Sequence, residues 1–156
     1  MNFPTLLFAT GNSTIDRVVS GLITIFEHLF PNRVSGYYLL GSYADGTALP
    51  SSDLDLVMLF RDRFASEQEF ATAVTINESC KLIAPVMLDA WVISDERTRQ
   101  PAFIGDTLEL KETGRLIYGV DTRQTIAAEA DAAYIRWAMD IPPYPITVAR
   151  STQGFV

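Results

Sequence analysis

The sequence predicts an α/β fold, in the α+β sense of helices packed on a sheet. Two observations support this prediction: apolar residues recur with helical spacing in several segments, and short, almost wholly apolar runs of strand length lie between those segments. The 156 residues are sufficient for one domain. With 48% hydrophobic and 20% charged residues, the composition is that of a globular domain and not of a disordered chain.

The first predicted element is a helix over residues 15–30, where apolar residues follow the helical period. Ser13 is a candidate N-cap and Pro31 ends the helix. A short apolar strand follows over residues 36–40 and stops at a Gly-Ser pair. Residues 44–52 then form a loop with one helical turn, because they combine glycine, proline and serine.

Residues 54–60 are nearly all apolar, which predicts a strand buried on both faces. Ser66 and Glu69 form a capping box that opens a helix, and Pro85 ends it. The predicted core face of that helix comprises Phe70, Ala73, Val74, Cys80, Ile83 and Ala84. A third strand is predicted over residues 86–93. The remaining predicted elements are a polar linker over 95–101, a helix over 103–112 ended by Gly114, an edge strand over 116–118, a helix over 127–139 and a proline-rich tail from 141.

The charge and the residue types exclude several classes of function. Twelve Lys and Arg against nineteen Asp and Glu give a net charge of −7, which argues against binding duplex nucleic acid but not against binding a nucleotide. The single cysteine, Cys80, excludes an internal disulfide and indicates a reducing compartment. One histidine and one cysteine also exclude a zinc cluster, so a metal would need oxygen ligands. Neither a signal peptide nor a membrane span is evident, and we expect a cytoplasmic protein.

Three aspartates stand on predicted strands and need an explanation. Asp53 and Asp55 are separated by one residue and therefore point to the same face of the second strand. Two neighbouring carboxylates on an apolar strand are costly unless a cation lies between them. Asp89 lies within the third predicted strand and completes a three-carboxylate cluster if the two strands are neighbours. Oxygen ligands favour Mg²⁺.

The Gly41-Ser42 pair at the end of the first strand supplies a second part of a site. A glycine allows a phosphate to approach the backbone, and backbone N–H groups with the Ser42 hydroxyl are donors to a triphosphate. Together with the three aspartates, this pair predicts a two-metal site for phosphoryl transfer.

The motif Gly41-Ser42-Tyr43-Ala44-Asp45-Gly46, followed by Ser52-Asp53-Leu54-Asp55-Leu56-Val57, resembles the signature of the polymerase beta-like nucleotidyltransferase superfamily. Within it the chain looks most like the aminoglycoside adenylyltransferases and the minimal nucleotidyltransferases, and the segment 114–119 resembles one that often follows their core. The resemblance implies a nucleotidyltransferase-type mixed β-sheet flanked by helices.

The resemblance also implies roles for five residues. Asp53 and Asp55 would bind Mg²⁺, Asp89 would bind metal or act as base for the acceptor hydroxyl, and Gly41 and Ser42 would bind the triphosphate of ATP or another nucleotide. It divides the chain into a nucleotidyltransferase core over residues 1–121 and a C-terminal region over residues 122–156. That second region would be the start of a missing or minimal acceptor-binding part.

Three functions remain as hypotheses. The first is an enzyme that transfers AMP from ATP to a hydroxyl of a small molecule such as an aminoglycoside. The second is a minimal nucleotidyltransferase antitoxin that binds or nucleotidylates a helical partner protein, and the third is a non-catalytic nucleotide-binding domain. A homodimer that completes the acceptor pocket is a further hypothesis.

Blander explanations of single residues also stay open. The pair Asp53 and Asp55 would then be a solvated loop edge, and Asp89 would pair with an arginine such as Arg115 in a structural salt bridge. Ser42 would only cap a helical turn.

Overall fold

Four strands form one mixed sheet in the order β3-β2-β1-β4. The structure is a computed structural model and describes residues 3–99 and 104–126. The strands are β1 (Val34–Leu39), β2 (Leu54–Phe60), β3 (Leu88–Ser94) and β4 (Arg115–Gly119). β1 runs antiparallel to both β2 and β4, whereas β2 and β3 are parallel. The predicted α/β fold with a mixed sheet is therefore confirmed.

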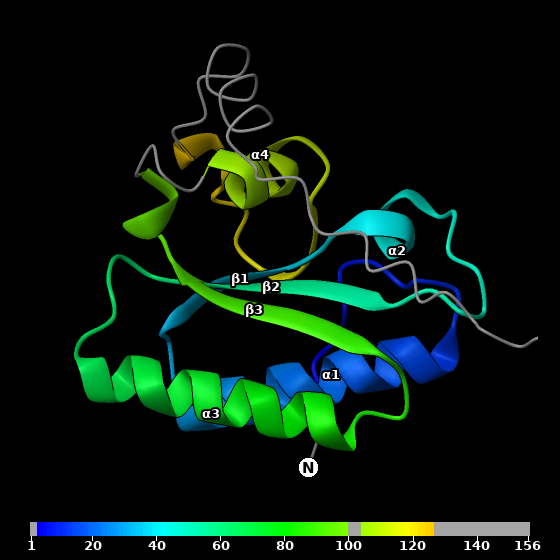
Figure 1. Ribbon diagram of the computed structural model, residues 1–156, viewed down its shortest axis with the longest axis horizontal. Helices are drawn as coiled ribbons and strands as arrows, with labels where there is room; N and C mark the ends of the chain where they lie inside the picture. Colours follow the sequence, from blue (N-terminus) through cyan, green and yellow to red (C-terminus); the bar gives the residue numbers. More distant parts are fainter. Residues whose placement is uncertain (1–2, 100–103, 127–156) are drawn as a thin grey trace, which may run out of the picture.

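Helices cover both faces of this sheet (Figure 1). Within the described residues the α-helices are α1 (Ser13–Leu29), α2 (Gly41–Asp45), α3 (Glu67–Ile83) and α4 (Ile104–Glu112). Short 3-10 helices are η1 (Arg97–Arg99) and η3 (Arg123–Thr125). α1 and α3 lie side by side on one face, while α4 lies over the other face and α2 stands near one end of the strands. No helix in the described part of the chain is long and apolar enough to cross a membrane.

Strand β2 shows why the sheet has two cores. Its alternate residues Leu54, Leu56, Met58 and Phe60 pack with α1 and α3 in the larger core. Val57 and Leu59 point the other way and belong to a smaller core with residues such as Leu110 and Ile126. Successive side chains of a strand alternate between faces. Asp55 therefore lies on the face of the smaller core, near one end of the strand.

Both long helices start with side-chain caps. The Asn12 side chain accepts hydrogen bonds from the backbone N–H groups of Thr14 and Ile15, so the cap of α1 is Asn12 and the prediction of Ser13 is wrong by one residue. The predicted cap of α3 is confirmed, because Ser66 Oγ accepts a hydrogen bond from the N–H of Glu69 over 3.1 Å. An oxygen at the N-cap satisfies N–H groups that have no partner inside the helix.

The inward face of α3 is narrower than predicted. Phe70 is 41% and Ile83 is 77% exposed, whereas Ala73 and Cys80 are buried as expected. α3 packs against β3, which stands at the edge of the sheet, so only a narrow stripe of the helix meets the sheet. The polar residue Asn77 belongs to this stripe.

Asn77 links α3 to the edge strand. Its side chain is buried, and its Nδ2 donates a hydrogen bond of 2.7 Å to the backbone carbonyl of Ala90 in β3. Its Oδ1 has no hydrogen-bond partner among the described residues. The amide nitrogen of Asn77 thus supplies a hydrogen bond to a backbone carbonyl on the outer side of β3.

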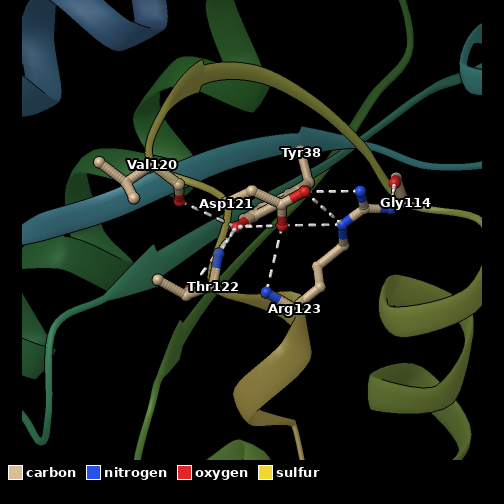
Figure 2. A network of polar contacts seen from close by, with 6 residues as sticks. All are labelled: Tyr38, Gly114, Val120, Asp121, Thr122 and Arg123. Atoms are coloured by element: carbon tan, nitrogen blue, oxygen red, sulfur yellow. Dashed lines mark hydrogen bonds and ion pairs between the residues drawn. The ribbon is translucent and has the colours of Figure 1, made fainter.

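A polar network attaches the segment after β4 to the rest of the fold (Figure 2). The N–H of Thr122 donates to the Tyr38 hydroxyl over 2.9 Å, and the Arg123 guanidinium pairs with the Asp121 carboxylate. Arg123 also donates to the backbone carbonyl of Gly114. The network ties the segment beyond β4 to β1. The predicted helix over 127–139 and the tail from 141 lie outside the described residues.

Candidate functional site

Three strand ends meet at one end of the sheet. β1 ends where β2 begins, because the two strands are antiparallel and Leu39 lies opposite Leu56. β3 begins beside them, since it is parallel to β2 and Asp55 is the register partner of Asp89. Side chains in register on parallel neighbours point to the same face of a sheet. The structure therefore places Asp55 and Asp89 on neighbouring strands, with Asp53 directly before β2. The adjacency of the two strands, on which the predicted cluster depended, is met.

The Gly41 turn lies directly against Asp55. Gly41 has φ +56°, and a Cβ built on it would lie 2.6 Å from Asp55 Oδ2. A backbone hydrogen bond of 3.0 Å from the N–H of Leu40 to the carbonyl of Asp55 holds the two segments together. Glycine is favoured here for two reasons: the backbone is left-handed, and a side chain would force the Asp55 carboxylate to move.

Ser42 belongs to the first turn of α2. The N-cap of α2 is Leu40, which gives no side-chain cap, so the hypothesis that Ser42 caps this turn is wrong. Ser42 is half-buried and lines a pocket of about 430 Å³ together with residues of the segment before α1 and of the loop after α2. Its backbone carbonyl accepts hydrogen bonds from Gly46 and Thr47, which close the single turn.

Burial and neighbouring carboxylates raise the proton affinity of Asp55. Burial raises the pKa of Asp55 to about 6, and the negative charges of Asp53, Asp89 and Glu109 add to this rise. Glu109 lies on α4 and was not among the predicted site residues. No sequence signal marks it, because only the packing of α4 over this face brings it near Asp55.

Asp89 has a lysine partner. Lys81 Nζ on α3 lies 3.6 Å from Asp89 Oδ1 and 3.1 Å from Glu78 Oε1. The hypothesis of a structural bridge between Asp89 and Arg115 is wrong. The guanidinium of Arg115 lies over the ring of Phe8, 3.4 Å from its centroid, and donates to the carbonyl of Ala44.

The site agrees with Mg²⁺ in donor chemistry. The charged groups that act on Asp55 are carboxylates, which are preferred ligands of hard divalent cations. A cation between them would relieve the repulsion that adds to the effect of burial on the pKa of Asp55. As placed, however, no three His, Cys, Asp or Glu side chains among the described residues are arranged to hold a metal ion. A cation held by Asp55 and Asp89 together with a third carboxylate would therefore require side chains to rotate.

Residues 19–113 match the family model of the nucleotidyltransferase domain. This range contains the Gly41 turn, both aspartates at the start of β2 and Asp89. The chain belongs to the nucleotidyltransferase domain family. The resemblance seen in the sequence is thereby confirmed, and the protein is an enzyme of the nucleotidyltransferase class. No curated protein sequence matches this nucleotidyltransferase significantly.

Solved structures agree with the fold of this nucleotidyltransferase. A spectinomycin adenyltransferase, AAD(9) from Enterococcus faecialis, solved with ATP and spectinomycin, is similar with a TM-score of 0.59 and 13% sequence identity. The similarity covers 80% of this chain and 64% of that chain. At this identity the likeness concerns the fold.

Two toxin-antitoxin structures match with lower TM-scores. One, solved with AMP-PNP, has a TM-score of 0.42 and 17% identity, and the match covers 76% of this chain and 84% of that chain. A mutant of the toxin-antitoxin pair MntA-HpeT has a TM-score of 0.44 and 16% identity, with 78% and 86% covered.

Proposed function

We propose that this nucleotidyltransferase transfers AMP from ATP to a hydroxyl group of a small molecule, with Mg²⁺ as cofactor. The contact between the Gly41 turn and the Asp55 carboxylate carries the proposal. It joins the expected triphosphate-binding turn to the expected metal ligand within one site. A triphosphate on the turn would therefore lie beside the carboxylates.

Asp53, Asp55 and Asp89 would hold the metal ions, and two ions are expected. The half-buried Asp55 has Asp89 as its register partner on the edge strand, and the exposed Asp53 precedes it by two residues. When bound, Mg²⁺ neutralises phosphate charge and lowers the pKa of an attacking hydroxyl. The N–H groups at Gly41 and Ser42, with the Ser42 hydroxyl, would orient the triphosphate.

In the proposed reaction, the acceptor oxygen forms a bond to the α-phosphorus of ATP. The bond from that phosphorus to the oxygen bridging to the β-phosphorus breaks, and pyrophosphate leaves with the electron pair. The hydroxyl proton passes to a carboxylate of the site or to water. Asp89 is either a third metal ligand or this base, and the pH profile of an Asp89→Asn variant separates the two roles.

The decisive experiment measures ATP binding by calorimetry with and without Mg²⁺. We expect ATP binding that requires Mg²⁺ in the wild type, and about 100-fold weaker Mg²⁺-dependent binding in Asp55→Asn, because a metal ligand is lost. Asp45→Asn is the matched control. Asp45 lies on α2, is exposed, and uses its carboxylate to accept hydrogen bonds from Thr47.

Transfer is then followed with ATP labelled at the α-phosphate. Small hydroxyl compounds, including aminoglycosides, are compared with helical partner proteins as acceptors. Label on a small molecule supports the proposal. Label on a protein alone would contradict a small-molecule acceptor and indicate a protein acceptor. Unchanged ATP binding in the Asp53→Asn, Asp55→Asn double variant would refute the assignment of the site.

A further inference from the structure

The ion pair between Lys81 and Asp89 passes around the open edge of the sheet. Leu88 and Ala90, the neighbours of Asp89 in β3, belong to the core under α1 and α3. Asp89 therefore points to the opposite face. Lys81 comes from α3, on the side of Leu88 and Ala90, and still places its Nζ 3.6 Å from Asp89 Oδ1. This contact is possible because β3 is the last strand of the sheet.

The pair gives Asp89 a positively charged partner at the sheet edge. Asp89 stands in register beside Asp55, yet no three acidic side chains in the described ranges are arranged to hold a metal ion. Like charges on neighbouring strands repel each other, and the ammonium at the edge offers Asp89 an attractive partner in the opposite direction. The side chain of Asp89 is 46% exposed, so it has room to rotate.

We propose that Lys81 is a positioning residue that holds Asp89 at the sheet edge while the site contains no cation, and releases it when a divalent cation binds. The inference rests on the proposed function, in which Asp89 is a cation ligand. It assigns to Lys81 no contact with substrate. Lys81 acts only through the orientation of Asp89.

Release of Asp89 leaves Lys81 with a partner. Glu78 Oε1 lies 3.1 Å from Lys81 Nζ, nearer than Asp89, and occupies the position three residues earlier on the same helix. When Asp89 turns to a cation, Lys81 thus keeps a neighbouring carboxylate. The side chain of Lys81 is also 24% exposed, so no desolvated charge remains uncompensated.

The test titrates the full chain with Mn²⁺ in the absence of nucleotide. Lys81→Met is expected to bind Mn²⁺ about two- to five-fold more tightly than the wild type, because the competing ion pair is lost. Lys81→Arg, which keeps the charge, is expected to bind as the wild type does. Thermal unfolding confirms that each variant is folded, and Lys81→Gln replaces Lys81→Met if the latter is not.

A double-mutant cycle separates positioning from a general charge effect. In an Asp89→Asn background, Lys81→Met is expected to leave Mn²⁺ affinity unchanged, because the residue through which Lys81 acts is no longer charged. An equal gain in affinity with and without Asp89 would refute the inference, as would no gain in either background. Loss of the proposed site itself has a different signature, in which Asp55→Asn binds Mn²⁺ as well as the wild type.

Discussion

At the scale of single residues, Gly41 is the most constrained position of the site. Its left-handed backbone and its contact with Asp55 are separate constraints, and the chain offers a way to separate them. Gly46, at the other end of α2, has φ +83° but no atom within 4 Å of a Cβ. Substitution of Gly46 therefore imposes backbone strain alone.

We expect Gly41→Ala and Gly46→Ala each to lose about 1–2 kcal/mol of unfolding free energy from left-handed strain. Only Gly41→Ala is expected to lose turnover as well, by about 100-fold, because its methyl group displaces the Asp55 carboxylate. Denaturant unfolding and AMP transfer measure the two effects. Equal turnover in the two variants would contradict the prediction.

The raised pKa of Asp55 predicts a pH-dependent stability. Because the folded pKa is about 6, above the ordinary value of 3.8, the folded protein retains a proton that the unfolded chain releases. The Asp55 contribution to the unfolding free energy therefore falls as pH rises from about 4 to about 6, and stays low above that range.

Asp55→Asn removes this titration. We expect the variant to unfold at a higher temperature than the wild type at pH 8, and the difference to narrow as pH falls toward 4. Thermal unfolding in metal-free buffer across this range is the measurement. A difference that is constant from pH 4 to pH 8 would show that Asp55 titrates normally.

At the scale of elements, the attachment of the chain after β4 depends on the Tyr38 hydroxyl. Tyr38→Phe leaves the N–H of Thr122 without the acceptor that it now has at 2.9 Å. We expect a loss of about 1–2 kcal/mol of unfolding free energy. Tyr118→Phe is the control, since its hydroxyl makes no hydrogen bond with the described residues. Urea unfolding of both variants measures the two losses of unfolding free energy. Equal losses would exclude a special role for the bond between Thr122 and Tyr38.

The strands and their shared end were predictable from local patterns. The apolar run over 54–60 coincides with β2. The common face of Asp53 and Asp55 stays a prediction, because Asp53 precedes the strand. The Asp89 strand was found as an element, although it begins at Leu88 and not at residue 86.

The partners of the carboxylates were not predictable. Lys81 and Glu109 lie on helices, α3 and α4. Whether these side chains reach the carboxylates depends on how each helix packs on the sheet, which the local sequence does not show. For the same reason the core face of α3 was overestimated at Phe70 and Ile83, since local periodicity does not reveal that a helix covers an edge strand. The motifs mark the expected ligands but not the charged residues that surround them.

At the scale of the whole molecule, the boundary of the core is open to test. The division after residue 121 stays a prediction. Thr122 and Arg123 bond to β1 and to Gly114, and Ile126 is 2% exposed in the smaller core. These contacts connect residues 122–126 to the sheet.

We expect the unfolding free energy of a chain that ends after residue 126 to be about 3 kcal/mol higher than that of a chain that ends after residue 121. Burial of Ile126 and the bond to Tyr38 account for this difference. Comparing the two truncated forms in urea isolates residues 122–126. Equal stability would place the boundary at residue 121.

The bond between Asn77 and the carbonyl of Ala90 has a consequence for self-association. An edge strand offers unpaired backbone groups to strands of other molecules, and this is a common route to aggregation. Asn77 already occupies one of those groups on β3 and anchors the adjoining helix along the edge. A strand from a second molecule would have to break this bond before forming a continuous ladder. The side chain that fastens α3 to the sheet thus leaves β3 with one backbone acceptor fewer for edge-to-edge pairing.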